Sequence, residues 1–194
     1  MVLALATWLP ILSVMLFVLR DRIGASAFAR AQREGLVHDV VGGIGLPVDV
    51  AATRPLRALM VAPFVPGHTW MTGLGALWLE GLAPPPDVID VAGPRGVHRT
   101  TPVAGSPPVV FHSGWLGGLP DGSAPRVATV TRACIDALSH SGADRALPAV
   151  ASALRARETS VDEMLDGVAH IDRHTHYRAR VEALVRAFAV LAET

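Results

Sequence analysis

The histidines of residues 170–176, HIDRHTH, are the first candidates for chemistry in this chain. His170 and His174 are four residues apart, a spacing that places two imidazole rings on one face of a helix and suits a pair of metal ligands. A structural zinc site usually has four clearly spaced ligands, however, and no cysteine lies near this segment. We therefore interpret the segment, His176 included, as an exposed polar connector between two helices and predict no metal site.

Two further patterns match catalytic or nucleotide-binding motifs incompletely. His112 and Ser113, with Asp121 nearby in the sequence, suggest a hydrolase, but a nucleophile elbow requires G-x-S-x-G and residues 111–115 read FHSGW. The stretch GGIG at residues 42–45 lacks the third glycine of a dinucleotide-binding turn and the Lys-Ser/Thr pair of a phosphate-binding loop. We expect a loop serine in the first case and an ordinary turn in the second.

A cluster of carboxylates also has a structural explanation. Asp162, Glu163 and Asp166 crowd the first turns of a helix that begins at the capping box of Ser160, where the helix dipole favours negative charge. We therefore predict no catalytic residues, no cofactor and no enzymatic activity.

The composition indicates a folded protein without a general affinity for polyanions. Hydrophobic residues make up 51% of the 194 residues and charged residues 18%, which excludes a disordered chain. All 17 basic residues are arginine, yet the formal net charge is zero, so there is no overall basic field for nucleic acid. Cys134 is the single cysteine, which excludes a disulfide framework and favours a reducing compartment.

Residues 1–19 contain no charged side chain and are followed by Arg20-Asp21-Arg22. A membrane-spanning helix needs about 20 apolar residues, so this stretch is at the lower limit. Pro10 interrupts it, and no basic residue precedes it as in a signal peptide. We expect a cytoplasmic protein in which this segment is buried; the alternative is a membrane anchor formed by residues 1–19.

A helix, a proline stop and a strand follow one another in residues 72–91. Apolar residues recur at helical spacing over residues 72–82, with Trp78 and Leu82 on the inward stripe. A proline triplet ends the helix, and residues 88–91 alternate as a strand does. We expect this unit to form the centre of the core.

The N-terminal region predicts a winged helix-turn-helix. A first helix is expected over residues 13–22 and a second over residues 26–33, with Ser26 as its N-cap. A hairpin follows, formed by residues 36–41 and 44–50 around a Gly-Gly turn. Helix, turn, helix and hairpin in this order are typical of that DNA-binding fold.

The C-terminal region predicts short strands and then helices. Arg132 and Asp136, at i and i+4, favour an ion pair on a helix surface. The expected strands cover residues 96–103 and 108–112, and the expected helices cover residues 129–138, 144–157, 160–168 and 177–191.

These patterns are similar to those of the AbiE-type antitoxins and their actinobacterial relatives. Residues 72–82 match the family's central pattern "S-H-x-x-A-A-x-L-H-G-L", which is followed by prolines and a strand. REGLVH at residues 33–38 is similar to the family's "R-x-G-x-L-V-R". Thr129, Arg132 and Asp136 stand near the polar positions of "V-T-x-P-x-R-T-x-x-D-L-A".

The resemblance implies a repressor of its own operon that neutralises a nucleotidyltransferase toxin without a cofactor. In many relatives a Vsr-like nuclease domain follows the helical tail, and we expect none in this protein. It also departs from the family. In the central helix, Glu80 replaces a histidine and Met71-Thr72 replaces the serine-histidine opening. In the wing, His38 and Asp39 stand where basic residues are expected, and Gly45 replaces a tyrosine.

We therefore predict an α+β fold with a winged helix-turn-helix in residues 1–52 and an antitoxin-like α+β domain with a helical C-terminal part in residues 53–194. The predicted DNA-binding residues are Ser26, Arg30 and Arg33 of the second helix and His38 of the wing.

The charges of residues 1–50 limit this expectation. Arg20, Arg22, Arg30 and Arg33 are matched by Asp21, Glu34, Asp39 and Asp49, and four minus four leaves no net charge. Operator DNA is thus expected to bind weakly. The alternative is a non-enzymatic interaction protein that has lost DNA binding, with or without a membrane tether.

Overall fold

The structure is a computed structural model that describes residues 17–94, 107–113, 126–171 and 177–192. Its first elements form a three-stranded antiparallel sheet in the order β1-β3-β2. The predicted hairpin is confirmed. These elements are β1 (Val18–Leu19), α2 (Arg20–Ile23), α3 (Ala25–Arg33), β2 (Val37–Val41) and β3 (Ile44–Pro47).

Two predictions for this region are wrong. The helix expected over residues 13–22 is replaced, where the structure describes it, by β1 and the single turn α2. The extended β1 pairs with the free edge of β3, which satisfies backbone groups that a helix would leave open. Ser26 is not an N-cap, because α3 begins after Gly24 and no side chain caps it. Gly24 has a φ of 85°, which glycine adopts without strain.

The second sheet has the order β4-β5-β6, with β5 and β6 parallel. The predicted helix and strand of the central unit are confirmed, although the helix ends at Leu79. The strand predicted over residues 96–103 lies outside the described residues. This part contains α4 (Arg54–Val61), a 3-10 turn η1 (Ala62–Phe64), β4 (Trp70–Met71), α5 (Gly73–Leu79), β5 (Ile89–Gly93) and β6 (Val109–Ser113).

Four helices complete the part of the chain that the structure describes: α6 (Val130–His140), α7 (Ala143–Ala156), α8 (Val161–Ala169) and α9 (Arg178–Ala192). Side chains cap two of these helices, and the capping box predicted at Ser160 is confirmed. The Thr129 hydroxyl accepts a hydrogen bond from the backbone N–H of Arg132, and Ser160 forms a full capping box with Glu163. The helix α7 starts after Gly142 and has Asp144 in its first turn.

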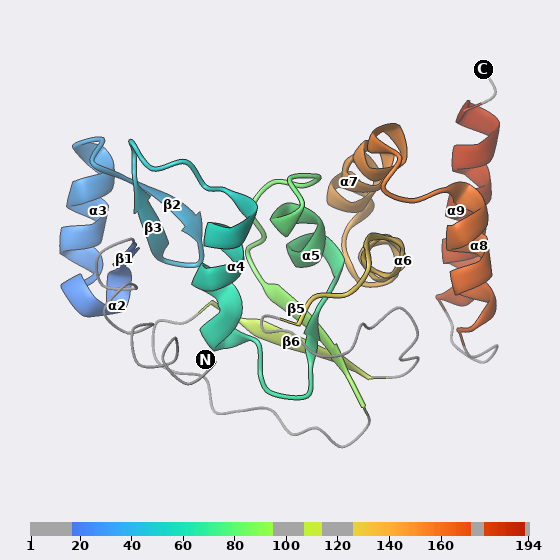
Figure 1. The fold of residues 1–194 in the computed structure, drawn as a ribbon, viewed down its shortest axis with the longest axis horizontal. Helices are drawn as coiled ribbons and strands as arrows, with labels where there is room; N and C mark the ends of the chain where they lie inside the picture. The colour runs from blue at the N-terminus through green and yellow to red at the C-terminus, as the bar shows by residue number, and fades with distance from the viewer. Residues whose placement is uncertain (1–16, 95–106, 114–125, 172–176, 193–194) are drawn as a thin grey trace, which may run out of the picture.

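The short helix α5 is shared by two hydrophobic clusters. Leu77 belongs to a cluster with α6, α7, α8 and α9, whereas Trp78 and Leu79 belong to a cluster with both sheets. The second cluster also joins Leu46 and Met60, which lie on either side of the predicted domain boundary at residue 52. In Figure 1, α5 accordingly lies between the N-terminal sheet and the helices α8 and α9.

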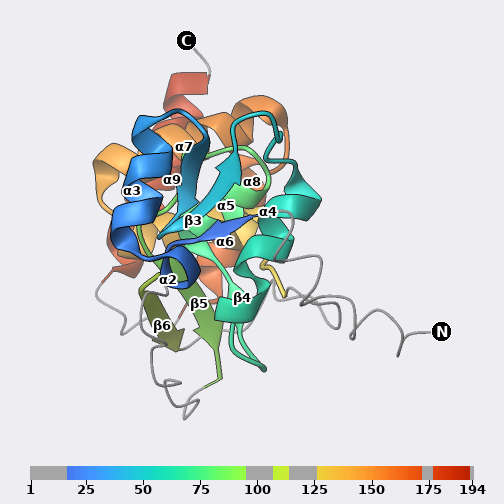
Figure 2. The ribbon, with the colours of Figure 1, turned by 90° about the vertical axis from the view of Figure 1, so that its left-hand side faces the viewer.

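The fold is therefore α+β, with its N-terminal sheet at one end (Figures 1 and 2). Among the described residues, no helix is long and apolar enough to cross a membrane. Residues 1–16 of the alternative membrane anchor lie outside the described ranges.

Candidate functional site

The helix α3 displays three of the four predicted DNA-binding residues. Phe28 is buried on its inner side and lies close to Gly45 of β3. Ser26, Arg30 and Arg33 are exposed, and their spacing of four and three residues places them on one stripe. The helix thus has one anchored face and one polar face.

Arg30 is held at the surface by a neighbouring carboxylate. Its Nε atom donates to Glu34 Oε1 at 2.7 Å, and the two side chains are 73% and 47% exposed. An exposed pair of this kind contributes little to stability, so its arginine can exchange the carboxylate for a phosphate at small cost.

His38, the fourth predicted residue, is exposed on β2 but does not join this stripe. Side chains alternate along a strand, and both Val37 and Phe28 lie beside Gly45. Val37 therefore faces α3, and His38 points to the opposite face of the sheet. Asp39 returns to the face that carries α3.

The turn of the β2-β3 hairpin, which is the predicted wing, is packed inside the molecule. Gly42 and Gly43 have φ values of 51° and 89°, and Asp39 Oδ1 accepts a hydrogen bond from Gly43 N at 3.2 Å. A Cβ atom on Gly42 would meet the Pro107 side chain at 2.4 Å, and one on Gly43 would meet Arg20 at 2.9 Å. This turn is therefore not available to enter a DNA groove.

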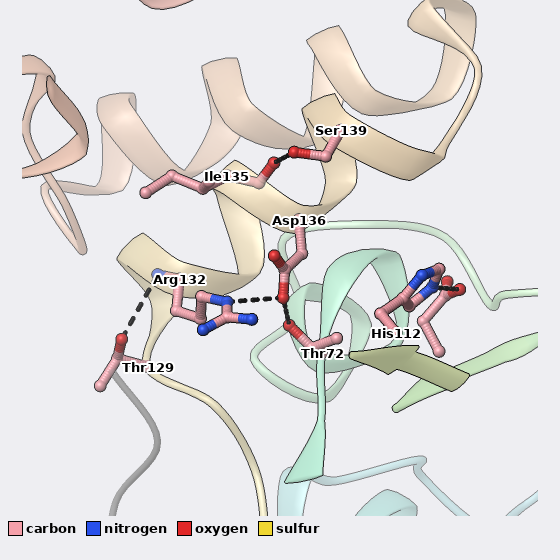
Figure 3. A network of polar contacts seen from close by, with 8 residues as sticks. Thr72, His112, Thr129, Arg132, Ile135, Asp136 and Ser139 are labelled. Carbon is pink, nitrogen blue, oxygen red and sulfur yellow. Dashed lines mark hydrogen bonds and ion pairs between the residues drawn. The ribbon is translucent and has the colours of Figure 1, made fainter. Parts of the chain in front are cut away.

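A buried polar network joins α5 to α6 (Figure 3). Asp136 Oδ2 accepts from Arg132 Nε at 2.7 Å and from the Thr72 hydroxyl at 2.6 Å. The predicted surface position of this ion pair is wrong, because Arg132 and Asp136 are each only 6% exposed. The pair faces α5 because Thr72, immediately before that helix, supplies a second hydrogen bond.

A second polar group lies on the sheet beside this network. His112 Nε2 and Asp90 Oδ1 are 2.8 Å apart, with side chains 15% and 17% exposed. The ring of His140 stacks on His112 with centroids 3.9 Å apart and an angle of 11°, and Tyr177 meets His140 edge-on at 5.1 Å. Residues from β5, from β6, from the end of α6 and from the position just before α9 therefore meet at the two imidazole rings.

The environment of His140 disfavours its charged form. His140 is an exposed residue, but the parts of its ring that contact His112 and Tyr177 are withdrawn from water. This desolvation, and then the charge that His112 would carry, lowers the pKa of His140 to about 4.

A pocket of about 280 Å³ opens next to the two rings. Its apolar walls include Leu74, Val88 and Val110, and its rim carries the ion pair between Arg145 and Asp87. In the sequence, His112 is a candidate catalytic residue, with Asp121 as the nearby carboxylate. Asp121 lies outside the described residues, and the carboxylate that His112 meets is Asp90, 22 positions away in the chain.

The histidine segment shows no metal site where it is described. His170 Nδ1 lies 2.7 Å from the carbonyl oxygen of Asp166, a contact within its own helix turn. His174 and His176 lie outside the described residues. In the described part of the chain, no group of three or more suitable side chains is placed to hold a metal ion.

Comparisons with known proteins identify no relative: no protein-family model matches this sequence, and no curated protein is significantly similar to it.

Proposed function

We propose that this chain is an antitoxin-like transcriptional regulator that binds its own promoter through α3 and counteracts a nucleotidyltransferase toxin. The observation that supports the DNA-binding part is α3 immediately before a hairpin, in a sheet of order β1-β3-β2, which is compatible with a winged helix. The proposal of a toxin partner is based on the resemblance of the sequence to the antitoxin family. α3 acts without the wing, because the turn at Gly42 is packed against Pro107.

The basic side chains of α3 carry this binding. The variant with both Arg30→Ala and Arg33→Ala should bind the gene's own upstream DNA at least about 10-fold more weakly, since each arginine that reads a base contributes about 1–3 kcal/mol. Fluorescence anisotropy at low salt measures this loss. The binding of the wild type is weak and should be lost early as salt rises, because there are few phosphate contacts.

A matched control removes two arginines from the opposite end of the molecule. Arg155 of α7 and Arg186 of α9 are also exposed on helices, so their double alanine variant changes the net charge equally. It should bind DNA as the wild type does. Equal loss in both variants would mean that charge alone, and not α3, is responsible; no binding by the wild type would refute the DNA-binding proposal.

Asp39 opposes DNA binding in this proposal, because it faces the side of the sheet that carries α3. Asp39→Asn should tighten binding by about 2- to 5-fold at low salt, since it removes a negative charge near the phosphates. The asparagine oxygen can still accept the hydrogen bond from Gly43, so the thermal midpoint should stay unchanged. Weaker or unaltered DNA binding by this variant would contradict the assigned surface.

The buried wing turn favours a second candidate, a non-enzymatic interaction protein that has lost DNA binding. In this case the wild type binds neither operator nor random DNA, and a pull-down from the native host recovers a protein partner. A carbonate wash of membranes tests the tether at residues 1–19, because an anchored protein stays in the pellet.

A further inference from the structure

The stacked rings of His112 and His140 connect parts of the fold that are distant in the sequence. His112 lies on β6, and His140 is the last residue of α6. Tyr177, which contacts His140 edge-on, directly precedes α9. The two rings therefore lie where the second sheet, the end of α6 and the start of α9 meet.

The two histidines differ in how a proton can be accommodated. A proton on His112 faces the carboxylate of Asp90 at 2.8 Å, which compensates its charge. Among the described residues, no side chain accepts a hydrogen bond from the ring of His140. Two positively charged rings stacked at 3.9 Å would repel each other strongly, because little water separates them.

The other charged groups near His140 act in opposite directions. Asp136 and Asp90 favour a proton on the ring, whereas Arg132 and a charged His112 disfavour it. From α7, Arg145 lines the same pocket as His140 and is paired with Asp87. From α9, Arg180 donates to the carbonyl oxygens of Leu138 and Ser139, immediately before His140.

We propose that the stack of His112 and His140 is an acid-sensitive latch between the second sheet, α6 and the first turn of α9. When His140 is neutral, its ring stacks on that of His112 and contacts Tyr177 edge-on. When His140 binds a proton, the stack separates, the pocket beside it opens, and the N-terminal end of α9 loosens. This latch does not depend on the proposed DNA binding.

The direction of the effect follows from the lowered pKa of His140. In the unfolded chain its pKa is near 6.5, and in the folded protein it is about 4. Between these two pH values the unfolded state binds more protons than the folded state. The contribution of His140 to the free energy of unfolding is therefore complete above about pH 6.5 and is lost as the pH falls toward 4. Below about pH 4 this group causes no further loss of stability.

His140→Phe tests the latch, because phenylalanine keeps a ring for His112 and Tyr177 but cannot bind a proton. We expect the urea midpoint of the wild type to fall between about pH 7 and about pH 4.5, and the midpoint of His140→Phe to fall clearly less. Hydrogen exchange of the first α9 amides, corrected for the intrinsic rate at each pH, should rise in the wild type and not in the variant. His38→Phe, which removes an exposed histidine of β2, should behave as the wild type does.

Two results would overturn the proposal. One is a urea midpoint that decreases equally on acidification in the wild type and in His140→Phe. The other, which needs no variant and so holds even if His140→Phe fails to fold, is an NMR titration in which the ring protons of His140 shift at about pH 6.5 and not near 4.

Discussion

Replacing Asp136 with alanine should lower the free energy of unfolding by about 3–5 kcal/mol, because it removes one member of a buried ion pair. Arg132 stays at 6% exposure with its Nε donor deprived of the carboxylate 2.7 Å away. The Thr72 hydroxyl loses its acceptor in the same substitution. Urea denaturation at neutral pH measures the change, and an unaltered m-value would show that the denatured state is the same.

Two control variants separate burial from ion pairing itself. Thr72→Val removes one hydrogen bond and should cost about 1 kcal/mol. Glu182→Ala breaks the i,i+4 pair with Arg186 on α9, which has the same spacing but is exposed, and it should leave the midpoint unchanged. If Asp136→Ala were as mild as Glu182→Ala, the network between α5 and α6 would not be a stabilising element.

Sequence patterns predict those parts of the fold that depend on near neighbours. The hairpin of β2 and β3 follows from two glycines with positive φ, and α8 follows from the capping box of Ser160 and Glu163. The central unit was predictable for the same reason, because helical spacing and the proline stop act over a few residues.

Features set by distant partners were not predictable. β1 is a strand only because the edge of β3, more than twenty residues later, is available to it. Arg132 and Asp136 have the spacing of an ordinary surface pair, and nothing local shows that Thr72 will face them across 64 positions. Burial of an i,i+4 pair is a tertiary property.

The candidate site also has features that local sequence patterns predict and features that depend on distant contacts. The polar stripe of Ser26, Arg30 and Arg33 follows from helical periodicity. The burial of the hairpin turn depends on Pro107. The contact of His112 with Asp90 depends on the pairing of β6 with β5, and its contact with His140 depends on the position of the end of α6. His112, the fourth residue of β6, gave one signal for the site in the sequence, and the residues that contact it gave none.

The second large effect is expected in α5, because every residue of this helix is buried between two hydrophobic clusters. Leu77→Ala should cost about 2–5 kcal/mol, since Leu77 is 0% exposed and its removal leaves a cavity against α6. Leu79→Ala should cost a similar amount on the other side, where the two sheets meet.

Leu82→Ala is the matched control on the same side as Leu77. The sequence places Leu82 on the inward stripe, but it lies beyond the end of α5 and is only partly buried against the first cluster. Its truncation should therefore cost clearly less than that of Leu77, because water fills part of the space that the side chain leaves. Urea midpoints that fall equally for Leu77→Ala and Leu82→Ala would contradict the deeper burial of Leu77 in the first cluster.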